Sequence, residues 1–382
     1  VLGAIELLNK DTGCFSETDM ALIKDHANTL GNADRPLADL DSKEAQKLVQ
    51  QFMNQTSSEH GSIFRIDRDS GHLYSLYAHG LKSPDIALNL NLGIAGLVAV
   101  SGQVFNIKDA ANDKRFDSSI DNKTGYRTRT ILALPLTDYN GETIGVIEVI
   151  NKRKGVFDDA DIDILKGLSS IVAIAIANAM MFDEQEKQFQ SFLEVMAASI
   201  DAKDRFTAGH STNVTRFAVG IANELGFNDS EVDVIRTAGL LHDYGKLGID
   251  DHILKKTGKL NEEEYSHIKK HVTITRAILE KMNFARKYRN VPAIASSHHE
   301  YLDGSGYDCG LQTHEIPFMA KIITVADVYE ALTADRLYRH AMPADKALAV
   351  LYEGVGNGKF DRNIVRALTS YLEKKQMIPA VG

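Results

Sequence analysis

The stretch IGVIEVINKRKGVFDDADIDIL, residues 144–165, decides the first half of the fold. A similar stretch, LGAIELLNKDTGCFSETDMALI, occupies residues 2–23. The two copies share glycine, isoleucine, glutamate, asparagine, lysine, phenylalanine and aspartate in the same register, so they form an internal repeat. Each copy reads as the last strand and the closing helix of a domain. We therefore expect residues 1–40 to be the C-terminal remnant of one domain and residues 41–180 to be a second, complete domain.

The residues before the second copy complete the pattern of a domain. Residues 42–53 read as a helix, and residues 62–67 and 72–78 read as strands that flank a turn. Together with LGIAGLVAVSGQVFNIKDAANDKRF (92–116) and TGYRTRTILALPLTDYNGETIGVIEVINK (124–152), they closely resemble the GAF family. The resemblance implies an α/β sensory domain with an antiparallel sheet and flanking helices, which binds a small molecule that the sequence does not identify.

Four residues of the repeat have the spacing of the NKFDE signature of that family: Asn151, Lys152, Phe157 and Asp161. Ile162 stands in place of the final glutamate. In the family this signature marks a subset that includes cyclic-nucleotide binders, so a cyclic nucleotide is one candidate ligand. Lys152 and Asp161 can equally form a structural pair that fastens the last strand to the following helix. Both interpretations stay open at this point.

A long helix is predicted after the second copy of the repeat. Apolar residues recur at helical spacing over residues 160–200, and no glycine or proline follows Gly167 in this range. Helices of this length are rarely stable alone and often pair as coiled coils. We therefore expect a connecting helix over residues 160–200 that carries a signal between domains and forms the seam of a homodimer.

The composition is that of an ordinary soluble protein with more than one domain. Of the 382 residues, 44% are hydrophobic and 25% are charged. A net charge of −9 argues against a DNA partner, because binding to the phosphate backbone requires a large basic surface. The longest near-apolar run, residues 171–182, is shorter than the roughly 20 residues that span a bilayer. We therefore expect a chain that does not cross a membrane. Because the two cysteines lack disulfide or metal spacing, we expect the protein to be cytoplasmic.

Histidine and aspartate gather in the second half of the chain. His242 and Asp243 follow the apolar run VDVIRTAGLL, so they lie at the buried end of a helix, where polar side chains need partners. Seven candidate metal ligands occur in this half: His210, His242, Asp243, His271, His298, His299 and Asp327. Imidazoles and carboxylates together suit first-row divalent ions, and a carboxylate between two sets of imidazoles can bridge two ions.

The ligand types indicate a reaction class. Two ions held close together activate a water molecule and neutralise the charge of a phosphate under attack, so the pattern predicts phosphoester hydrolysis. We expect two divalent ions, iron or manganese first, with nickel or zinc as alternatives, because the same ligands serve all four metals.

Five stretches of this half together resemble the HD-GYP subgroup of the HD phosphohydrolases. They are DAKDRFTAGHS (201–211), LLHDYGKLGI (240–249), LKKTGKLNEEEYSHIKKHV (254–272), SSHHEYLDGSGYDCGL (296–311) and ITVADVYEALTADRLYR (323–339). The resemblance implies an all-α domain over residues 190–382 with a metal-bridged active site. It also implies hydrolysis of cyclic di-GMP to linear pGpG, to GMP or to both, regulation by the GAF domain, and a diguanylate cyclase as a protein partner.

Position by position, the resemblance assigns roles to the residues of the site. The seven candidates match the metal ligands, and Asp243 matches the bridge. Lys246 matches a catalytic lysine that approaches the scissile phosphate, and Tyr307 matches a substrate-facing residue of the DGxGYP loop. Arg336 and Arg339 resemble a clamp on the substrate phosphate, although a solvated basic patch or salt bridges to nearby aspartates would also explain them.

Four positions of this half depart from the family: Asp250 and Val272 replace prolines, and two further departures bear on function. Asp308 replaces the proline of the loop, which removes a fixed φ angle and adds negative charge near an anionic ligand. Phe206 stands where members with a third metal tend to have glutamate, which favours two ions. Three functions therefore stay open: an active cyclic di-GMP phosphodiesterase, a phosphodiesterase for cyclic GMP-AMP, and a receptor that binds a cyclic dinucleotide or a protein partner without turnover.

Overall fold

The chain divides into two compact units, residues 1–187 and residues 188–382. The structure, a computed structural model, describes residues 42–79, 87–204, 209–335 and 340–378, and each unit is described here by itself. The domain remnant expected at residues 1–40 lies outside the described residues.

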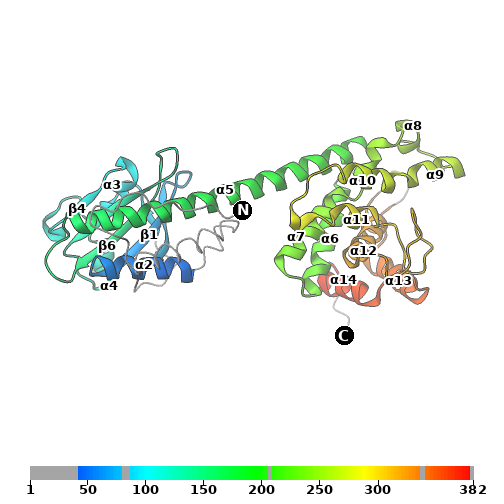
Figure 1. Cartoon of the computed structure of the whole chain (residues 1–382). Coiled ribbons are helices and arrows are strands. Elements are labelled where there is room, and N and C mark those ends of the chain that lie inside the picture. Colours follow the sequence, from blue (N-terminus) through cyan, green and yellow to red (C-terminus); the bar gives the residue numbers. More distant parts are fainter. Residues whose placement is uncertain (1–41, 80–86, 205–208, 336–339, 379–382) are drawn as a thin grey trace. The chain divides into compact units, whose positions relative to one another are not determined.

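The first unit contains a six-stranded antiparallel sheet with the strand order β3-β2-β1-β6-β5-β4 (Figure 1). The strands are β1 (Ser58–Asp67), β2 (His72–Ala78), β3 (Ala87–Asn89), β4 (Phe105–Ile107), β5 (Ile131–Thr137) and β6 (Thr143–Lys152). The repeated stretch forms β6, which lies at the centre of the sheet between β1 and β5. The two predicted strands are confirmed, although β1 begins four residues before the predicted start at Ser62, at Ser58.

Helices cover both faces of this sheet because successive side chains of its strands point to opposite sides. On one face, Ile147 of β6 packs in a core with α2 (Ser42–Gln55) and with the first part of α5 (Asp159–Lys203). On the other face, Val146 packs with α3 (Gly93–Ser101) and with the short helix η2 (Ala110–Asn112). A further short helix, α4, spans Ser119–Thr124.

The NKFDE residues fasten β6 to α5. The ammonium of Lys152 donates to the carboxylate of Asp161 and, at 3.3 Å, to that of Asp158. Asp161 also accepts the backbone N–H of Asp158 at 2.8 Å, which closes the turn before α5. Phe157, between strand and helix, is buried in the same core. The structural pair, one of the two interpretations of this signature, is therefore present.

The predicted connecting helix is confirmed as α5, which is 45 residues long. Its most apolar window has a mean hydropathy of 1.7, and among the described helices α5 alone has the length and composition to cross a membrane. Within that window 39% of the residues are buried, and Val172 and Ile176 belong to the core beneath the sheet. Length and composition alone are therefore weak evidence for a membrane span, since core helices share them.

Among its described residues, the second unit contains helices joined by loops and no strand. Its helices are α6 (His210–Glu224), α7 (Asp229–Leu241), η3 (Tyr244–Gly248), α8 (Asp251–Leu254), α9 (Glu262–Lys269), α10 (His271–Leu279), η4 (Arg286–Tyr288), α11 (Val291–Ser296), α12 (Phe318–Thr333), α13 (Ala344–Gly356) and α14 (Arg362–Lys374). Side chains of α6, α7, α12 and α14 build its main core.

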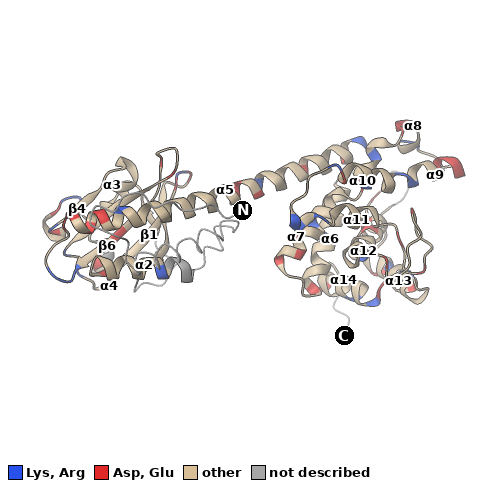
Figure 2. Cartoon of the chain, in the orientation of Figure 1, with Lys and Arg blue, Asp and Glu red and all other residues tan. Residues whose placement is uncertain are grey.

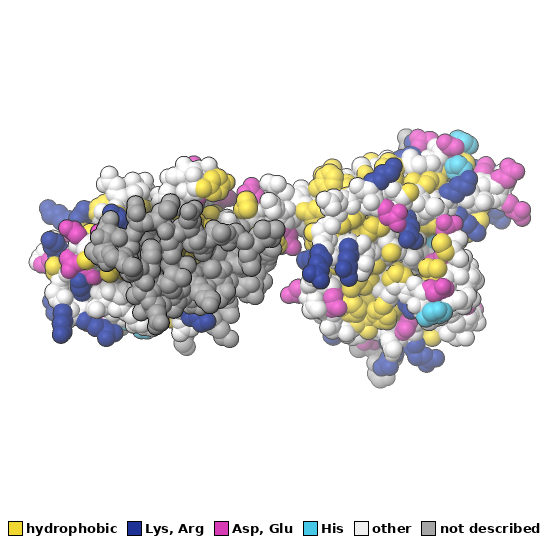
Figure 3. Space-filling view, in the orientation of Figure 1, with side chains coloured by type: hydrophobic (Ala, Val, Ile, Leu, Met, Phe, Trp, Pro, Cys, Tyr) yellow, Lys and Arg dark blue, Asp and Glu magenta, His cyan; other side chains and the backbone are white. Residues whose placement is uncertain are grey.

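Local sequence explains where two of these helices begin. Asn228 and Asn261 each accept a backbone N–H in a capping box, with Glu231 and Glu264 as the reciprocal partners. Three consecutive glutamates open α9, where Figure 2 shows them in red, and they face the positive end of the helix dipole. On the face displayed in Figure 3, basic, acidic and apolar side chains are interspersed over this unit.

Candidate metal centre

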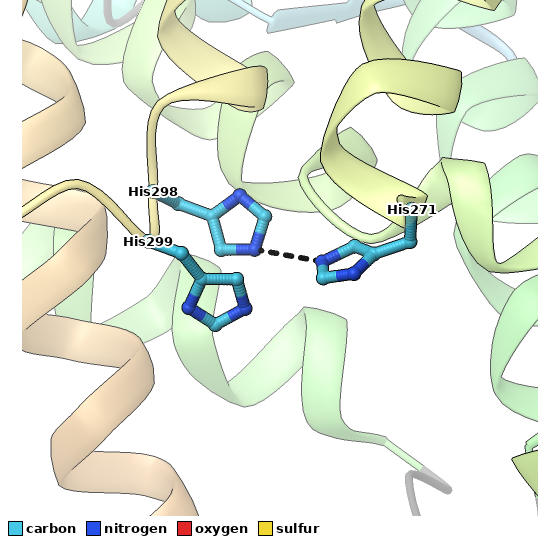
Figure 4. A group of neighbouring side chains, drawn as sticks. All are labelled: His271, His298 and His299. Atoms are coloured by element: carbon cyan, nitrogen blue, oxygen red, sulfur yellow. Dashed lines mark hydrogen bonds between the residues drawn. The ribbon is translucent and has the colours of Figure 1, made fainter. Parts of the chain in front are cut away.

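The structure brings all seven candidate ligands together inside the helical unit. Their ligand atoms form three groups, within each of which the atoms lie within 4.8 Å of one another: His210, His242 and Asp327; His242, Asp243 and His298; His271, His298 and His299. Among the described residues, the three groups are made up of the seven candidates and of no other histidine, cysteine, aspartate or glutamate. Figure 4 shows the third group, in which Nε2 of His271 and Nε2 of His298 are 3.4 Å apart.

Helix ends supply most of these ligands. His210 and His271 are the first residues of α6 and α10, His242 and Asp243 directly follow α7, and the two remaining histidines follow α11. Of the seven, only Asp327 lies away from a helix end, in the apolar middle of α12. The expectation that His242 and Asp243 lie at the buried end of a helix is confirmed.

A glycine allows two of these helix ends to approach. A Cβ atom at position 245, in η3, would lie 1.9 Å from the carbonyl oxygen of His271. The N–H of Gly245 donates to the hydroxyl of Thr275 at 2.8 Å, and that hydroxyl donates to the carbonyl of His242 at 3.1 Å. Any side chain at position 245 would therefore push α10 and its histidine away from the turn after α7.

Backbone carbonyls orient three of the imidazoles in the same way. In His242, His271 and His298, Nδ1 lies 2.6 to 2.8 Å from the carbonyl oxygen three residues earlier. Because a carbonyl only accepts, Nδ1 carries the hydrogen and Nε2 presents a lone pair to the centre. His210 is held by a carboxylate instead, with its Nδ1 2.5 Å from Glu330.

One imidazole nitrogen provides a test of whether these residues fit a metal. Nε2 of His242 is fully buried and makes no hydrogen bond to any described residue. A buried acceptor without a partner costs about 1–3 kcal/mol, so such groups are rare unless a ligand completes them. The oriented lone pairs and the nearby carboxylates together fit divalent first-row ions.

Asp243 lies between two sets of imidazoles. Its Oδ2 is 3.5 Å from Nε2 of His242 and 3.6 Å from Nε2 of His210. Its Oδ1 is 3.3 Å from Nε2 of His271 and 3.9 Å from Nε2 of His298. One carboxylate oxygen therefore faces each set, which is the arrangement that a bridging ligand requires.

The electrostatics of the centre follow from burial and from its carboxylates. Burial disfavours the charged imidazole and lowers the pKa of His298, and it lowers the pKa of His299 to about 4. Burial also opposes charge on His210, but Asp327 and Glu330 outweigh it and raise the pKa of this residue to about 10. The protonated His210 thus neutralises the negative charge of Asp327 and Glu330. A cation bound at the centre would neutralise the same charge.

Lys246 lies beside the proposed bridge. Its ammonium is 2.8 Å from Asp243 and 3.1 Å from Asp204, and both carboxylates are buried. Burial opposes the charge, but these two partners outweigh it and raise the pKa of Lys246. A cavity of about 600 Å³ opens onto the centre, and its lining includes Lys246, Tyr307 and Lys259. The cavity is large enough for a small-molecule ligand.

The loop that carries Tyr307 is tied down by a buried carboxylate. Glu300 accepts the backbone N–H groups of Cys309, Gly310 and Leu311 at 2.8 to 3.1 Å. The ring of Tyr307 lies 4.7 Å from that of His299, between the loop and the centre.

Asp308 is less disruptive than the sequence suggested. It is exposed, and its carboxylate accepts the hydroxyl of Thr273 on α10. This hydrogen bond anchors the side chain to α10, and the residues that line the cavity do not include Asp308.

Sequence reasoning missed three buried acids that support the centre. Glu330 is three residues after Asp327 on the same helical face, Asp204 lies in the quoted stretch before His210, and Glu300 directly follows the histidine pair. An acidic residue in the apolar stretch of α12 was a usable signal for Glu330. Arg336, Arg339 and Phe206 lie outside the described residues.

Comparison with known proteins identifies both units. The family model of the GAF domain matches residues 39–177, and that of the HD domain matches residues 194–364. The "3'3'-cGAMP-specific phosphodiesterase 3" of Vibrio cholerae serotype O1 is 44% identical over 41% of this chain and 33% of its own. The "3'3'-cGAMP-specific phosphodiesterase 1" of the same organism is 39% identical over 47% of this chain and 41% of its own.

A third relative carries a different substrate in its name. The "Cyclic di-GMP phosphodiesterase response regulator" of Xanthomonas campestris pv. campestris is 38% identical over 49% of this chain and 49% of its own. The match thus spans between a third and a half of the length of these relatives. The chain thus carries a GAF domain followed by an HD domain.

Proposed function

We propose that the HD domain is a metal-dependent phosphodiesterase that hydrolyses a cyclic dinucleotide. The observation that carries this proposal is the position of Asp243, with one carboxylate oxygen toward each of two imidazole sets. Relatives named as phosphodiesterases for cyclic di-GMP and for 3'3'-cGAMP support the substrate class.

The seven ligands would hold two divalent ions, with iron or manganese as the first choice. His210, His242 and Asp327 would hold one ion and His271, His298 and His299 the other, with Asp243 shared. Such a pair, when bound, supplies an activated water and neutralises the charge of the phosphate. Hydrolysis adds one water for each phosphodiester bond broken, so one cut gives a linear dinucleotide and a second gives mononucleotides.

Residues of the chain would bind and orient the substrate. Lys246 lines the cavity, where its ammonium would stabilise the charge that develops on the phosphate. Burial raises the pKa of Tyr307, so its hydroxyl stays protonated and can donate a hydrogen bond to the substrate. Arg336 and Arg339 remain the predicted phosphate clamp, because a guanidinium fork matches phosphate oxygens.

The first unit would regulate the site through α5. We expect the GAF domain to bind a small molecule and to change the state of this helix. A cytoplasmic location fits Cys309, which is unpaired among the described residues. A diguanylate cyclase partner stays a prediction from the resemblance to HD-GYP proteins.

A homodimer through α5 is part of the proposal. Four apolar side chains of α5 are about half-exposed: Ile174, Met181, Phe192 and Val195. Three of them are separated by multiples of seven residues and the fourth lies three residues before Val195, so they fit the a and d positions of one heptad pattern. A second copy of the helix would cover this stripe.

The proposal is tested by measuring turnover of two substrates. The chain is purified without oxygen, its bound metals are quantified, and cyclic di-GMP and 3'3'-cGAMP are each followed by chromatography. We expect at least one to be converted to a linear or mononucleotide product. Tight binding of a cyclic dinucleotide without turnover, with metals present, would instead identify a receptor.

A further inference from the structure

The last residue of α5 reaches into the HD domain through a set of hydrogen bonds. The ammonium of Lys203 donates to the backbone carbonyls of Lys246, Leu247 and Ile249 at 3.1, 2.8 and 2.9 Å. An ammonium has three donors, and here each has a separate carbonyl. Most of the side chain is covered, with an exposed fraction of 21%.

Two of the carbonyls that Lys203 binds belong to the turn that carries Lys246, and the third, of Ile249, directly follows it. This turn is η3, a short 3₁₀ helix, whose own bonds include the N–H of Lys246 to the carbonyl of Asp243 at 2.9 Å. Short 3₁₀ segments have poorer hydrogen-bond geometry than α-helices. The three bonds from Lys203 therefore hold in place a turn that is weakly stabilised by itself.

The residues beside Lys203 contact the same centre. Asp204, directly after α5, accepts the ammonium of Lys246 at 3.1 Å. Asp201, one turn earlier on the helix, accepts the N–H of Gly209 at 2.9 Å and the hydroxyl of Ser211 at 3.0 Å. Gly209 and Ser211 flank His210. The end of α5 therefore binds the ammonium of Lys246 and also the segment that carries His210.

We propose that Lys203 is a positioning residue, which sets the place of the Lys246 ammonium by holding the backbone of residues 246–249 to the end of α5. The proposal rests on the proposed function, in which Lys246 faces the substrate phosphate. The residues that line the cavity do not include Lys203, and its described partners include no candidate metal ligand, so we infer that it acts through Lys246. Because α5 begins at Asp159 in the GAF unit, this contact is where a change in the helix would reach the site.

The test is a double-mutant cycle in the full chain. Lys203→Met keeps the length of the side chain but removes its three donors, and we expect kcat to fall about tenfold or more, because small misplacements of catalytic groups cost that much. KM and bound metal should stay unchanged. In a chain that already carries Lys246→Met, the same substitution should have no further effect. Losses that multiply, or loss of metal, would show that Lys203 does not act through Lys246.

A control variant and a second measurement test the role of Lys203 independently of the proposed phosphodiesterase activity. Lys281, an exposed lysine just after α10, serves as the control through Lys281→Met. Hydrogen exchange is read at the amides of Lys246 and Ile249, which are both hydrogen-bonded within the turn. We expect exchange about tenfold faster in Lys203→Met than in the control. Unchanged exchange would overturn the inference even if the chain hydrolyses no cyclic dinucleotide, whereas inactivity with faster exchange would overturn only the proposed function.

Discussion

At the scale of single residues, the centre depends on acids that are not candidate ligands. Glu330 holds Nδ1 of His210 at 2.5 Å, and Asp204 holds the ammonium of Lys246 at 3.1 Å. Both are buried. An outer carboxylate fixes the orientation of an imidazole and raises its basicity as a ligand. These two residues therefore decide how well the site is formed before a metal binds.

Glu330→Gln tests this supporting role. The amide keeps the size of the side chain but loses the negative charge that orients His210, so we expect metal affinity to fall about 10–100-fold. The measurement is a titration of the metal-free protein with Mn²⁺. Glu353→Gln, at an exposed position of α13, is the matched control and should leave the affinity unchanged. Equal affinities in the two variants would contradict the role of Glu330.

A pH-dependent stability is expected in the GAF domain. Burial raises the pKa of Glu148 on β6 from 4.5 to about 7. The folded state therefore keeps a proton that the unfolded state releases, so this contribution is complete below pH 4.5 and is lost as pH rises through 7.

Glu148→Gln should remove that pH dependence. Relative to wild type, the variant should gain about 1–3 kcal/mol in unfolding free energy between pH 5 and pH 8. Urea unfolding followed by circular dichroism at both values gives the difference, with Glu142→Gln at an exposed turn as the control. A constant difference across this range would rule out a raised pKa for Glu148.

The seven candidate ligands could be selected from the sequence because each lies in a short stretch with its own pattern, such as LLHDYGKLGI or SSHH. Their supporting partners could not. Lys203 binds carbonyls more than 40 residues away, and backbone carbonyls leave no trace in the amino-acid sequence. The sequence predicted Asp243 as the bridging residue. The distances from its carboxylate to the two imidazole sets depend on how α6, α7 and α10 pack.

At the scale of elements, the loop after the histidine pair is shaped by Glu300. Gly306 is required there, because a Cβ atom would lie 2.6 Å from the carbonyl oxygen of His299. The loop was expected to be loosened by Asp308. Its three N–H bonds to Glu300 show that another residue fixes it, which a pattern centred on the missing proline could not reveal.

Glu300→Gln should loosen this loop. Only one oxygen remains for three N–H donors, so at least one is left without a partner at a cost of about 1–3 kcal/mol. We expect a lower unfolding temperature and a higher KM, because Tyr307 loses its fixed place. Glu315→Gln is the comparison, since Glu315 is exposed and accepts one N–H in the same region. An unchanged KM in Glu300→Gln would show that the loop does not position the substrate.

At the scale of the whole molecule, α5 both belongs to the GAF core and presents an apolar stripe. Helix periodicity predicted its extent to within a few residues, because no glycine or proline interrupts it after Gly167. Periodicity could not say which apolar residues are used by the sheet. The structure assigns Val172 and Ile176 to the core and leaves Met181 exposed.

Met181→Glu tests the proposed dimer. A charge on the stripe of each copy would repel its counterpart, so we expect a species near twice the 42.1 kDa of one chain to shift toward the monomer mass. Light scattering after size exclusion measures this. Lys187→Glu, exposed but off the stripe, should leave the mass unchanged. A wild-type chain that is monomeric at all concentrations would contradict the dimer.

The central claim is a two-metal centre bridged by Asp243, and metal stoichiometry tests it most directly. The metal-free chain is reconstituted with Mn²⁺ without oxygen, and bound manganese is counted per chain for wild type and for Asp243→Ala. The control is Asp229→Ala, at an exposed acid at the start of α7. The account predicts two ions in wild type and in the control, and less than one in Asp243→Ala, because both imidazole sets lose their shared carboxylate. A wild-type chain that binds one ion or none, or an Asp243→Ala variant that retains both, would contradict it.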